Sequence, residues 1–338
     1  MTEQKRKIEL LLSPVILILP FAAAILCIGI GRYHISPMDS LRVLATSLTG
    51  GVTDPTAYSV IMNVRLPRII LALFVGAGLA VSGTSFQALF SNPLATPDTL
   101  GVATGASFGA VLALLISNNV LVTQLAALAA GLLALVITCA ISKMNGKSSI
   151  IMVVLAGMVV SSLFEALVSL MKYVADPEED LPTITYWLMG SMSKASLSGI
   201  AFGVPLIALG ILLLFLLRWR LNILSLNEDE AKSLGINVKS LRLIVMAAAT
   251  LVTASSVSMC GQVGWVGLLI PHTARMMFGS DNRKIIPASI CLGAAFMVVI
   301  DTAARAATAA EIPVSILTAI IGAPFFIVLL RKTGGAKL

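Results

Sequence analysis

Long apolar runs separated by short polar connections dominate the sequence, and most of these runs are about 20 residues long. That is the length of an α-helix that crosses the hydrocarbon core of a bilayer, whereas a transmembrane β-barrel shows alternating segments of about ten residues. We therefore predict an all-α membrane protein with about ten transmembrane helices. The ten runs cover residues 10–31, 67–90, 101–116, 121–142, 150–172, 196–217, 243–260, 264–279, 285–304 and 313–330.

Composition supports an integral membrane protein. Of the 338 residues, 58% are hydrophobic and only 12% are charged, against about 25% charged residues in a soluble domain. We predict a single transmembrane domain over residues 1–338. The cysteines stand singly inside apolar runs without CxxC spacing, so neither a disulfide framework nor a metal site is indicated; they are Cys27, Cys139, Cys260 and Cys291.

The positive charges orient the chain. The first apolar run, Leu10 to Gly31, is too long for a signal peptide, so we expect a retained first helix. Alternation from a cytoplasmic N-terminus places sixteen of the 23 lysine and arginine residues on the cytoplasmic side, as the positive-inside rule requires. Both termini are therefore predicted to be cytoplasmic. Basic loops on one face also explain the net charge of +7, so no nucleic-acid partner is needed.

The predicted outer connection, residues 32–66, contains a helix of its own. Ser36 is a suitable N-cap, Pro37 fits the first helical position, and Asp39 follows in the first turn. Leucines on one face then predict an amphipathic helix that lies on the membrane or on the helix bundle.

The longest predicted cytoplasmic connection, residues 218–242, has the pattern of a docking surface. Asn227 can cap a short polar helix whose first residues are acidic, which suits the positive end of a helix dipole. Gly235 can end that helix in a left-handed conformation, and we expect a second short helix after it.

Motifs for catalysis or nucleotide binding are absent. The stretch Asn145–Ser149 contains Gly-Lys-Ser, but Ile141 stands where a phosphate-binding loop needs its first glycine. His34 and His272 are isolated, and no Ser/His/Asp arrangement is visible. We therefore predict no enzymatic activity, no cofactor and no metal site.

Small residues at a spacing of four predict close helix contacts. Gly101, Gly105 and Gly109 form one GxxxGxxxG ridge, and Gly199 and Gly203 form a second pair. Such spacing puts small residues on one helix face and lets two backbones approach each other.

Charges inside the apolar runs need partners or water. Glu165 lies well within the fifth run, where an ionised carboxylate costs roughly 2.5–3.5 kcal/mol. It either lines a pathway or a subunit interface, or it is simply hydrated near the outer mouth. Asp301 and Arg305 are spaced i,i+4 near the outer end of the ninth run, which predicts a salt bridge between them.

Two arginines precede the second run in the sequence RLPR. Arg65 and Arg68 fall on the outer side, against the orientation bias, and Pro67 is expected near the first turn of the second helix, where its missing N–H costs nothing. Basic residues at a membrane rim can steer and seat an acidic partner. Alternatively, snorkelling arginines anchor the helix end.

Long motifs in a fixed order resemble the FecCD family of ABC-transporter permeases, and the resemblance covers nearly the whole chain. The family imports iron–siderophore complexes, haem and cobalamin. The matching stretches are RLPR (Arg65–Arg68), GAGLAVSGTSFQALFSNPLATPDTLGVATGAS (Gly76–Ser107), LAG (Leu155–Gly157), YWLMGS (Tyr186–Ser191), AKSLGINV (Ala231–Val238), GWVGLLIPHTARMMFGSDNRKIIPAS (Gly264–Ser289) and, after DTAAR, EIPVSILTAIIGAPFFIVLL (Glu311–Leu330).

The resemblance implies a type II ABC importer permease in a bacterial inner membrane. It would form a homodimer or pair with a paralogue, with the cargo passing along the subunit interface beside the fifth and tenth helices. Two cytoplasmic ATPase subunits would drive transport, and an extracytoplasmic binding protein would deliver the cargo. Ferric siderophores rank first as cargo, then haem and cobalamin, then oxyanions or other metal chelates.

The resemblance also assigns roles to residues. Docking of the binding protein falls on Arg65, Arg68 and Arg305. Coupling to the ATPase falls on Asn227, Glu228, Asp229, Glu230, Ala231, Leu234 and Gly235. The cytoplasmic gate falls on Asn92, Pro93, Leu94, Ser148 and Ser149. Glu165 departs from the small or neutral residue expected on the pathway.

Two other classes of function stay open from the residues alone. An ion-coupled secondary transporter could use Glu165 and Asp301 as carriers, and an uncoupler would then abolish uptake. A structural or signalling membrane protein would move no substrate in proteoliposomes.

Overall fold

The fold is a bundle of α-helices, which the computed structural model describes for residues 3–48, 51, 54–117, 119–143, 150–225, 228–233 and 235–333. Within these ranges there is no β-strand. A π-helical segment covers Val60–Arg65, and 3-10 segments cover Pro97–Leu100 and Arg220–Ser225. The α-helices are α1 (Glu3–Gly29), α2 (Pro37–Leu48), α3 (Pro55–Ser59), α4 (Leu66–Leu89), α5 (Val102–Ile116), α6 (Val120–Ser142), α7 (Ile150–Val174), α8 (Asp180–Leu188), α9 (Leu197–Leu216), α10 (Glu228–Ser233), α11 (Val238–Cys260), α12 (Val266–Phe278), α13 (Asn282–Ala307) and α14 (Val314–Thr333).

Each of the ten predicted spans coincides with a helix, and the ends differ by at most seven residues. Seven segments are long and apolar enough to cross a membrane unaided: α1, the rod that contains α4, α6, α7, α9, α11 and α13. Helix α5 and the apolar part of α14 are shorter, and α12 has 13 residues. The protein is an all-α, multi-pass membrane protein in which two of the predicted spans, α5 and α12, are shorter than the membrane thickness.

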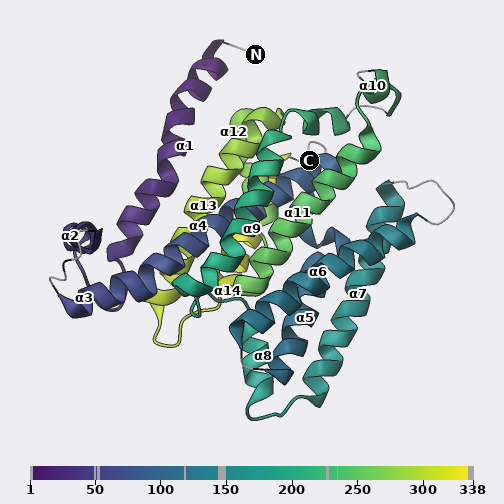
Figure 1. Ribbon diagram of the computed structural model, residues 1–338. Helices are drawn as coiled ribbons and strands as arrows, with labels where there is room; N and C mark the ends of the chain where they lie inside the picture. Colours follow the sequence, from purple (N-terminus) through teal and green to yellow (C-terminus); the bar gives the residue numbers. More distant parts are fainter. Residues whose placement is uncertain are drawn as a thin grey trace.

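Two ends of the bundle can be distinguished in Figure 1. Helix α10, the start of α1 and the end of α14 lie towards one end, and α8 lies at the other. We call these the α10 end and the α8 end. From the distribution of positive charge, we predict that the α10 end lies in the cytoplasm and the α8 end outside it. Helix α8 itself was not predicted, because its nine residues give too short a pattern.

Helix α4 is the centre of the bundle. It packs against α9, α11, α12 and α13, and 83% of the residues in its apolar window are buried, against 28% in α6, α7 and α9. Glycine makes this crowding feasible. A Cβ atom on Gly76 would overlap the Gly293 carbonyl of α13, and one on Gly83 would overlap the Gly267 carbonyl of α12.

The predicted glycine ridge of α5 is a helix–helix contact. A Cβ on Gly105 would lie 2.7 Å from the Cβ of Ala134, and one on Gly109 would overlap the carbonyl oxygen of Ala126. Both neighbours belong to α6. Gly203 of α9 packs against the Met259 side chain of α11, so the predicted close packing is confirmed at Gly105, Gly109 and Gly203. Gly101 instead precedes α5 and faces Ser161 of α7, and a Cβ on Gly199 would come no closer than 3.9 Å to α6.

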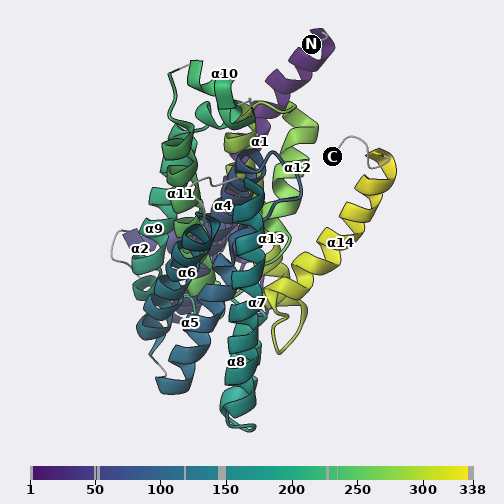
Figure 2. The same cartoon turned by 90° about the vertical axis from the view of Figure 1, so that its right-hand side faces the viewer.

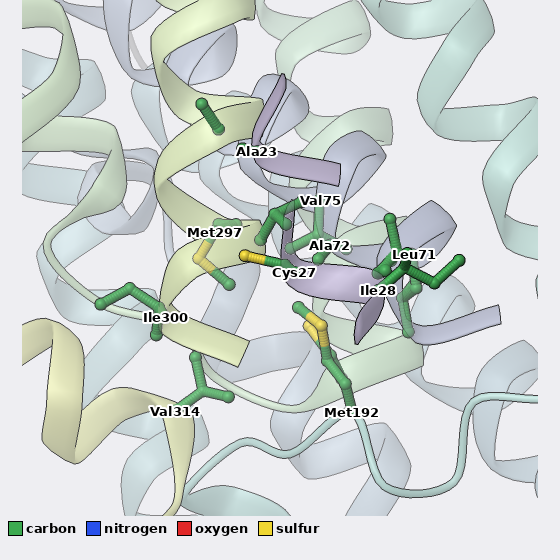
Figure 3. Packing of buried hydrophobic residues seen from close by; sticks show 14 of the residues in the cluster. Ala23, Cys27, Ile28, Leu71, Ala72, Val75, Met192, Met297, Ile300 and Val314 are labelled. Atoms are coloured by element: carbon green, nitrogen blue, oxygen red, sulfur yellow. The ribbon is translucent and has the colours of Figure 1, made fainter. Parts of the chain in front are cut away.

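One end of α1 is fixed to the bundle by apolar packing. Figure 3 shows Cys27 and Ile28 of α1 close to Val75 of α4 and Met297 of α13, with Val314 at the start of α14 nearby. This cluster holds the last turn of α1 next to the helices that carry the three predicted docking arginines.

Helix α14 is the least enclosed of the long helices. Figure 2 shows it diverging from the bundle. Its first residues are held by the backbone N–H of Val314, which donates to the Gly190 carbonyl at 2.9 Å, and by the Ser315 hydroxyl, which donates to the Gln262 carbonyl at 2.9 Å. Further along, Gly322 packs against the ring of Trp265.

The segment before α4 departs from the prediction. Pro67 is the second residue of α4, as predicted, but helix α3, the π-helical segment and α4 are continuous, so it also lies inside a longer helical rod. The Leu66 N–H donates to the Ile61 carbonyl, five residues back. A proline lacks an N–H and crowds the carbonyl four residues earlier, and the wider π turn just before Pro67 provides room for its ring.

The predicted cap of the outer amphipathic helix is confirmed. The backbone N–H of Asp39 donates to the Ser36 hydroxyl oxygen at 3.1 Å, and α2 begins at Pro37.

Candidate functional site

Arg65 completes the hydrogen bonding at the end of α1. Its Nη1 donates to the carbonyls of Ile28 at 2.8 Å and Gly29 at 3.0 Å, and its Nη2 donates to the Tyr33 carbonyl. The last carbonyls of a helix have no partner within the helix, and a cation there also complements the dipole. Arg65 is therefore a C-cap for α1, and its side chain is only 2% exposed.

Arg68 is held between two carboxylates that are distant in sequence. Its Nη2 lies 2.8 Å from Asp301 Oδ1, and its Nη1 lies 2.9 Å from Glu311 Oε1. Asp301 comes from α13, and Glu311 comes from the connection to α14, where it adopts a left-handed φ of 48°. Such a backbone conformation is uncommon for a residue other than glycine, so the ion pair holds Glu311 in a strained position.

Arg305 joins the same group of side chains. Its Nη2 donates to the Cys27 carbonyl at 2.6 Å, and its Nε lies 3.8 Å from Asp301 Oδ2. The predicted salt bridge between Asp301 and Arg305 is confirmed, but Arg68 approaches the same carboxylate more closely.

The structure thus brings the three predicted docking arginines into one buried network, here called the arginine cluster: Arg65, Arg68, Arg305, Asp301 and Glu311. The cluster joins α1, α4, α13 and the connection to α14. None of the three arginines is more than 6% exposed, whereas the side chain of Glu311 is 28% exposed. Their role in docking remains a prediction, and their contacts within the chain give them a structural role.

Glu165 lines a polar cavity of about 520 Å³ at the side of α5 and α7. Asp98, from the 3-10 segment before α5, lines the same cavity, as do Lys172 and several hydroxyls. The wall is ordered by Gln262, whose Nε2 donates to the Ser107 hydroxyl oxygen at 2.9 Å. Glu165 therefore faces a polar cavity and not the apolar core of the bundle.

The charge of Glu165 acts on the neighbouring carboxylate of Asp98. Desolvation by the surrounding protein, and secondarily the charge of Glu165, raise the pKa of Asp98 to about 6, although the residue keeps contact with solvent at the cavity. Perturbed carboxylates in a cavity mark candidate functional sites.

The predicted gate turn is ordered by its own asparagine. Asn92 follows the end of α4, and its side-chain oxygen accepts the N–H of Leu94 at 2.9 Å. Asn92 and Leu94 are exposed. Ser148 and Ser149, the other half of the predicted gate, lie outside the described residues, so the gate remains a prediction.

The predicted coupling segment contains the expected short helix, α10, and Gly235 follows it with a left-handed φ of 73°. Ala231 is buried against the start of α11, while Glu230 is exposed. Asn227 and Leu234 lie outside the described residues, as do the side chains of Glu228 and Asp229. The prediction of a second short helix after Gly235 is wrong. The residues that follow form the first turns of α11, because Asn237 caps that helix by accepting the Ser240 N–H.

Sequence reasoning missed Glu311 and Asp98. Glu311 is 243 residues away from Arg68, and no local pattern marks it as its partner. The sequence does contain one indication of such partners: Arg65 and Arg68 lie at a membrane rim without a neutralising charge nearby in the sequence, which predicts acidic residues on the same side of the membrane. In the described part of the chain, no group of three His, Cys, Asp or Glu side chains could hold a metal ion.

The sequence matches the FecCD transport family over residues 16–332. It is 44% identical over 312 residues to the molybdate import system permease protein of Haemophilus influenzae, covering 91% of this chain and 92% of that protein. It is 39% identical to the probable iron chelatin transport system permease protein of Helicobacter pylori, covering 82% and 83% of the two chains.

The fold also matches a solved structure. A transporter assigned to the metal-chelate type of ABC transporter, in an inward-facing conformation, superposes with a TM-score of 0.84 at 40% sequence identity. The match covers 94% of this chain and 97% of that chain.

Proposed function

Because this chain belongs to the FecCD transport family and is an ABC importer permease, we propose that it transports a metal chelate, with ferric siderophore complexes as the cargo. Two permease subunits, identical or paralogous, would enclose the pathway between them. Two separate ATPase subunits would dock at the α10 end, and an extracytoplasmic binding protein would dock at the α8 end. The complex would lie in the cytoplasmic membrane of a bacterium.

The observation that carries the cargo assignment is the cavity shared by Glu165 and Asp98. Two carboxylates and one lysine, Lys172, line this cavity. Its excess of acidic groups disfavours an anion such as molybdate and offers acceptors to hydrogen-bond donors or positive charge on the surface of a chelate. This charge pattern favours a metal chelate over a free oxyanion.

The exposed faces of two helices support the position of the pathway. Helix α7, which carries Glu165, exposes Leu155 and Val159, and α14 exposes Ile320 and Val328. A second permease subunit that covers these faces would close the cavity beside α7 into a pathway. The test of the dimer is the mass of the detergent-solubilised complex.

We further propose that acidic residues of the binding protein act on the arginine cluster. Glu311 is its most exposed carboxylate, so an incoming carboxylate would replace Glu311 on Arg68. The cluster carries three cations and two carboxylates, and this excess of positive charge would attract an acidic partner.

The docking proposal is tested with Glu311→Gln, which keeps the size of the side chain and leaves Arg68 with one carboxylate. We expect the binding protein to bind more tightly, by about threefold to tenfold, with a steeper dependence on salt. Unchanged affinity and unchanged salt dependence would contradict the exchange of carboxylates at Arg68.

The cargo proposal is tested by transport in proteoliposomes that contain the permease, its ATPase and the binding protein. We expect ATP-dependent uptake of a ⁵⁵Fe-labelled ferric siderophore, and reduced uptake in Glu165→Lys, with Glu178→Lys on an exposed connection as the control. Uptake that persists without ATP and collapses with an uncoupler would identify a secondary transporter instead.

A second candidate cargo is molybdate, because the H. influenzae relative at 44% identity is named for it. The same proteoliposomes would then accumulate ⁹⁹Mo-labelled molybdate but no ferric siderophore. In that case Glu165→Gln is expected to raise uptake, since it removes a charge that repels the anion.

A further inference from the structure

A second cavity, of about 580 Å³, lies at the α8 end of the bundle, away from Glu165. It is enclosed by α6, α8, α9 and α11, and none of the predicted site residues lines it. Part of its wall is apolar, with Leu71, Leu114, Ile200 and Met259 among the lining side chains. The rest of the wall is polar. A ligand that fits both parts of the wall must itself have a polar and an apolar portion.

The amide of Gln124 has no partner within the described part of the chain. Gln124 lies in the second turn of α6, is only 4% exposed and lines the cavity. Its Nε2 lies 3.9 Å from the position that a Cβ on Gly199 would take, in the first turn of α9. The polar atoms of this amide remain accessible from the cavity, where they can hydrogen-bond to a polar group of a bound ligand.

Groups that favour an anion surround the same place. Helix α9 begins here, with the Ser196 hydroxyl accepting the Gly199 N–H at 3.1 Å, and the N-terminus of a helix attracts negative charge. Lys194 lines the mouth, is exposed and makes no ion pair with a described residue. Ser193 and Ser196 add hydroxyls beside it.

The mouth of the cavity continues into apolar surface. Val120 and Leu121 at the start of α6, and Leu197 at the start of α9, are each 45–49% exposed. Tyr186 and Trp187 line the same cavity, and these are the aromatic residues that accumulate where a protein crosses the membrane–water interface. A soluble anion would gain no free energy from contact with this apolar surface, whereas the acyl chain of a lipid would be stabilised by it.

We propose that this cavity binds one anionic phospholipid, with its phosphate between Lys194, the start of α9 and the Gln124 amide, and with an acyl chain along Leu71, Ile200 and Met259. The site is separate from the pathway, and the proposal does not depend on which cargo the protein carries. Lys194 is the one described cation that lines this mouth. A phosphate that contacts both Lys194, next to α9, and Gln124 of α6 would link the two helices.

The test is lipid binding to the purified chain, measured by native mass spectrometry with phosphatidylglycerol, phosphatidylcholine and inorganic phosphate as probes. We expect one phosphatidylglycerol to bind more tightly than phosphatidylcholine and to raise the unfolding temperature. Lys194→Gln is expected to weaken binding about fivefold, the effect of one basic residue at an anionic lipid surface. Gln124→Leu should weaken it as well.

The matched control is Arg42→Gln, an exposed arginine of α2 that does not line the cavity and should leave lipid binding unchanged. A position-specific readout is quenching of Trp187 by phosphatidylglycerol with brominated acyl chains, in a chain whose Trp219 and Trp265 are replaced by phenylalanine. If that chain does not fold, the bound masses on wild type and Lys194→Gln still decide.

Three outcomes would overturn the proposal. Equal stabilisation by inorganic phosphate would show an anion site without a lipid. Equal loss of binding in Lys194→Gln and Arg42→Gln would show a diffuse effect of surface charge. Bound phosphatidylglycerol that leaves Trp187 unquenched would place the lipid elsewhere.

Discussion

A guanidinium inside a helix bundle needs either a ring of acceptors or an opposite charge, and the arginine cluster uses both solutions. Arg65 takes the carbonyls at the end of α1, whereas Arg68 takes two carboxylates. The desolvation of a buried ion pair is offset only when its geometry is good. Removing one partner therefore costs more than the pair itself contributes.

For Arg68 this asymmetry gives a sharp prediction. Arg68→Gln leaves Asp301 buried and without its closest cation, and we expect a loss of about 3–5 kcal/mol in the free energy of unfolding. Denaturant unfolding in detergent, followed by tryptophan fluorescence, measures it. Arg42→Gln is the control, because the Arg42–Asp39 pair is exposed and should change stability by less than about 1 kcal/mol.

Asp281, at the start of α13, is likewise a partly buried charge that hydrogen bonds and an opposite charge stabilise. Its carboxylate accepts the N–H of Arg283 at 2.9 Å and an amide proton of Asn222 at 2.7 Å, which ties the 3-10 segment Arg220–Ser225 to α13. Partial burial raises the pKa of this carboxyl, but these hydrogen bonds and the Arg283 guanidinium outweigh it and lower the pKa below its ordinary 3.8.

A lowered pKa fixes the direction of a pH effect. The stabilisation by ionised Asp281 is complete above its ordinary pKa and is lost as pH falls through the lower pKa of the folded state. We expect Asp281→Ala to cost about 1 kcal/mol at pH 7 and progressively less towards pH 3. A difference in unfolding temperature between the two proteins that is the same at pH 7 and pH 3 would contradict this.

Among elements, close helix crossings decide which helices are neighbours. The contact of α5 with α6 depends on Gly109, where a Cβ would overlap a backbone carbonyl of α6 that cannot move without moving its helix. Other side chains of these helices, such as Leu112 of α5 and Val136 of α6, are exposed on the surface of the bundle, and changes there should be tolerated. The sequence spacing identified the contact face of α5, and the structure identified α6 as the partner.

Gly109→Ala is predicted to destabilise the protein by about 1–3 kcal/mol through overpacking, although alanine is otherwise the better helix former. Gly264→Ala is the matched control, since no atom lies within 4 Å of the added Cβ and the change should be near neutral. Thermal unfolding of the two variants compares them. Equal unfolding temperatures would show that α5 and α6 separate easily.

At the scale of the whole molecule, the orientation of the bundle remains a prediction from charge. Single cysteines at Glu178, in the connection before α8, and at Lys239, at the start of α11, can test it in a chain without its native cysteines. Both positions are exposed. In intact cells, a membrane-impermeant maleimide should label position 178, and it should label position 239 only after permeabilisation; the reverse pattern would invert the topology.

The sequence by itself determined the long apolar helices, the cap at Ser36 and the glycine face of α5, because apolar period, capping residues and small-residue spacing all act over a few neighbouring residues. It also indicated that charges near the membrane rim needed partners. Only the tertiary structure supplied those partners, since Arg68 meets Asp301 and Glu311 across 233 and 243 residues of chain. The π turn before Pro67, the cavity shared by Glu165 and Asp98, and the unpartnered amide of Gln124 depend in the same way on how distant helices come together, which no local pattern encodes.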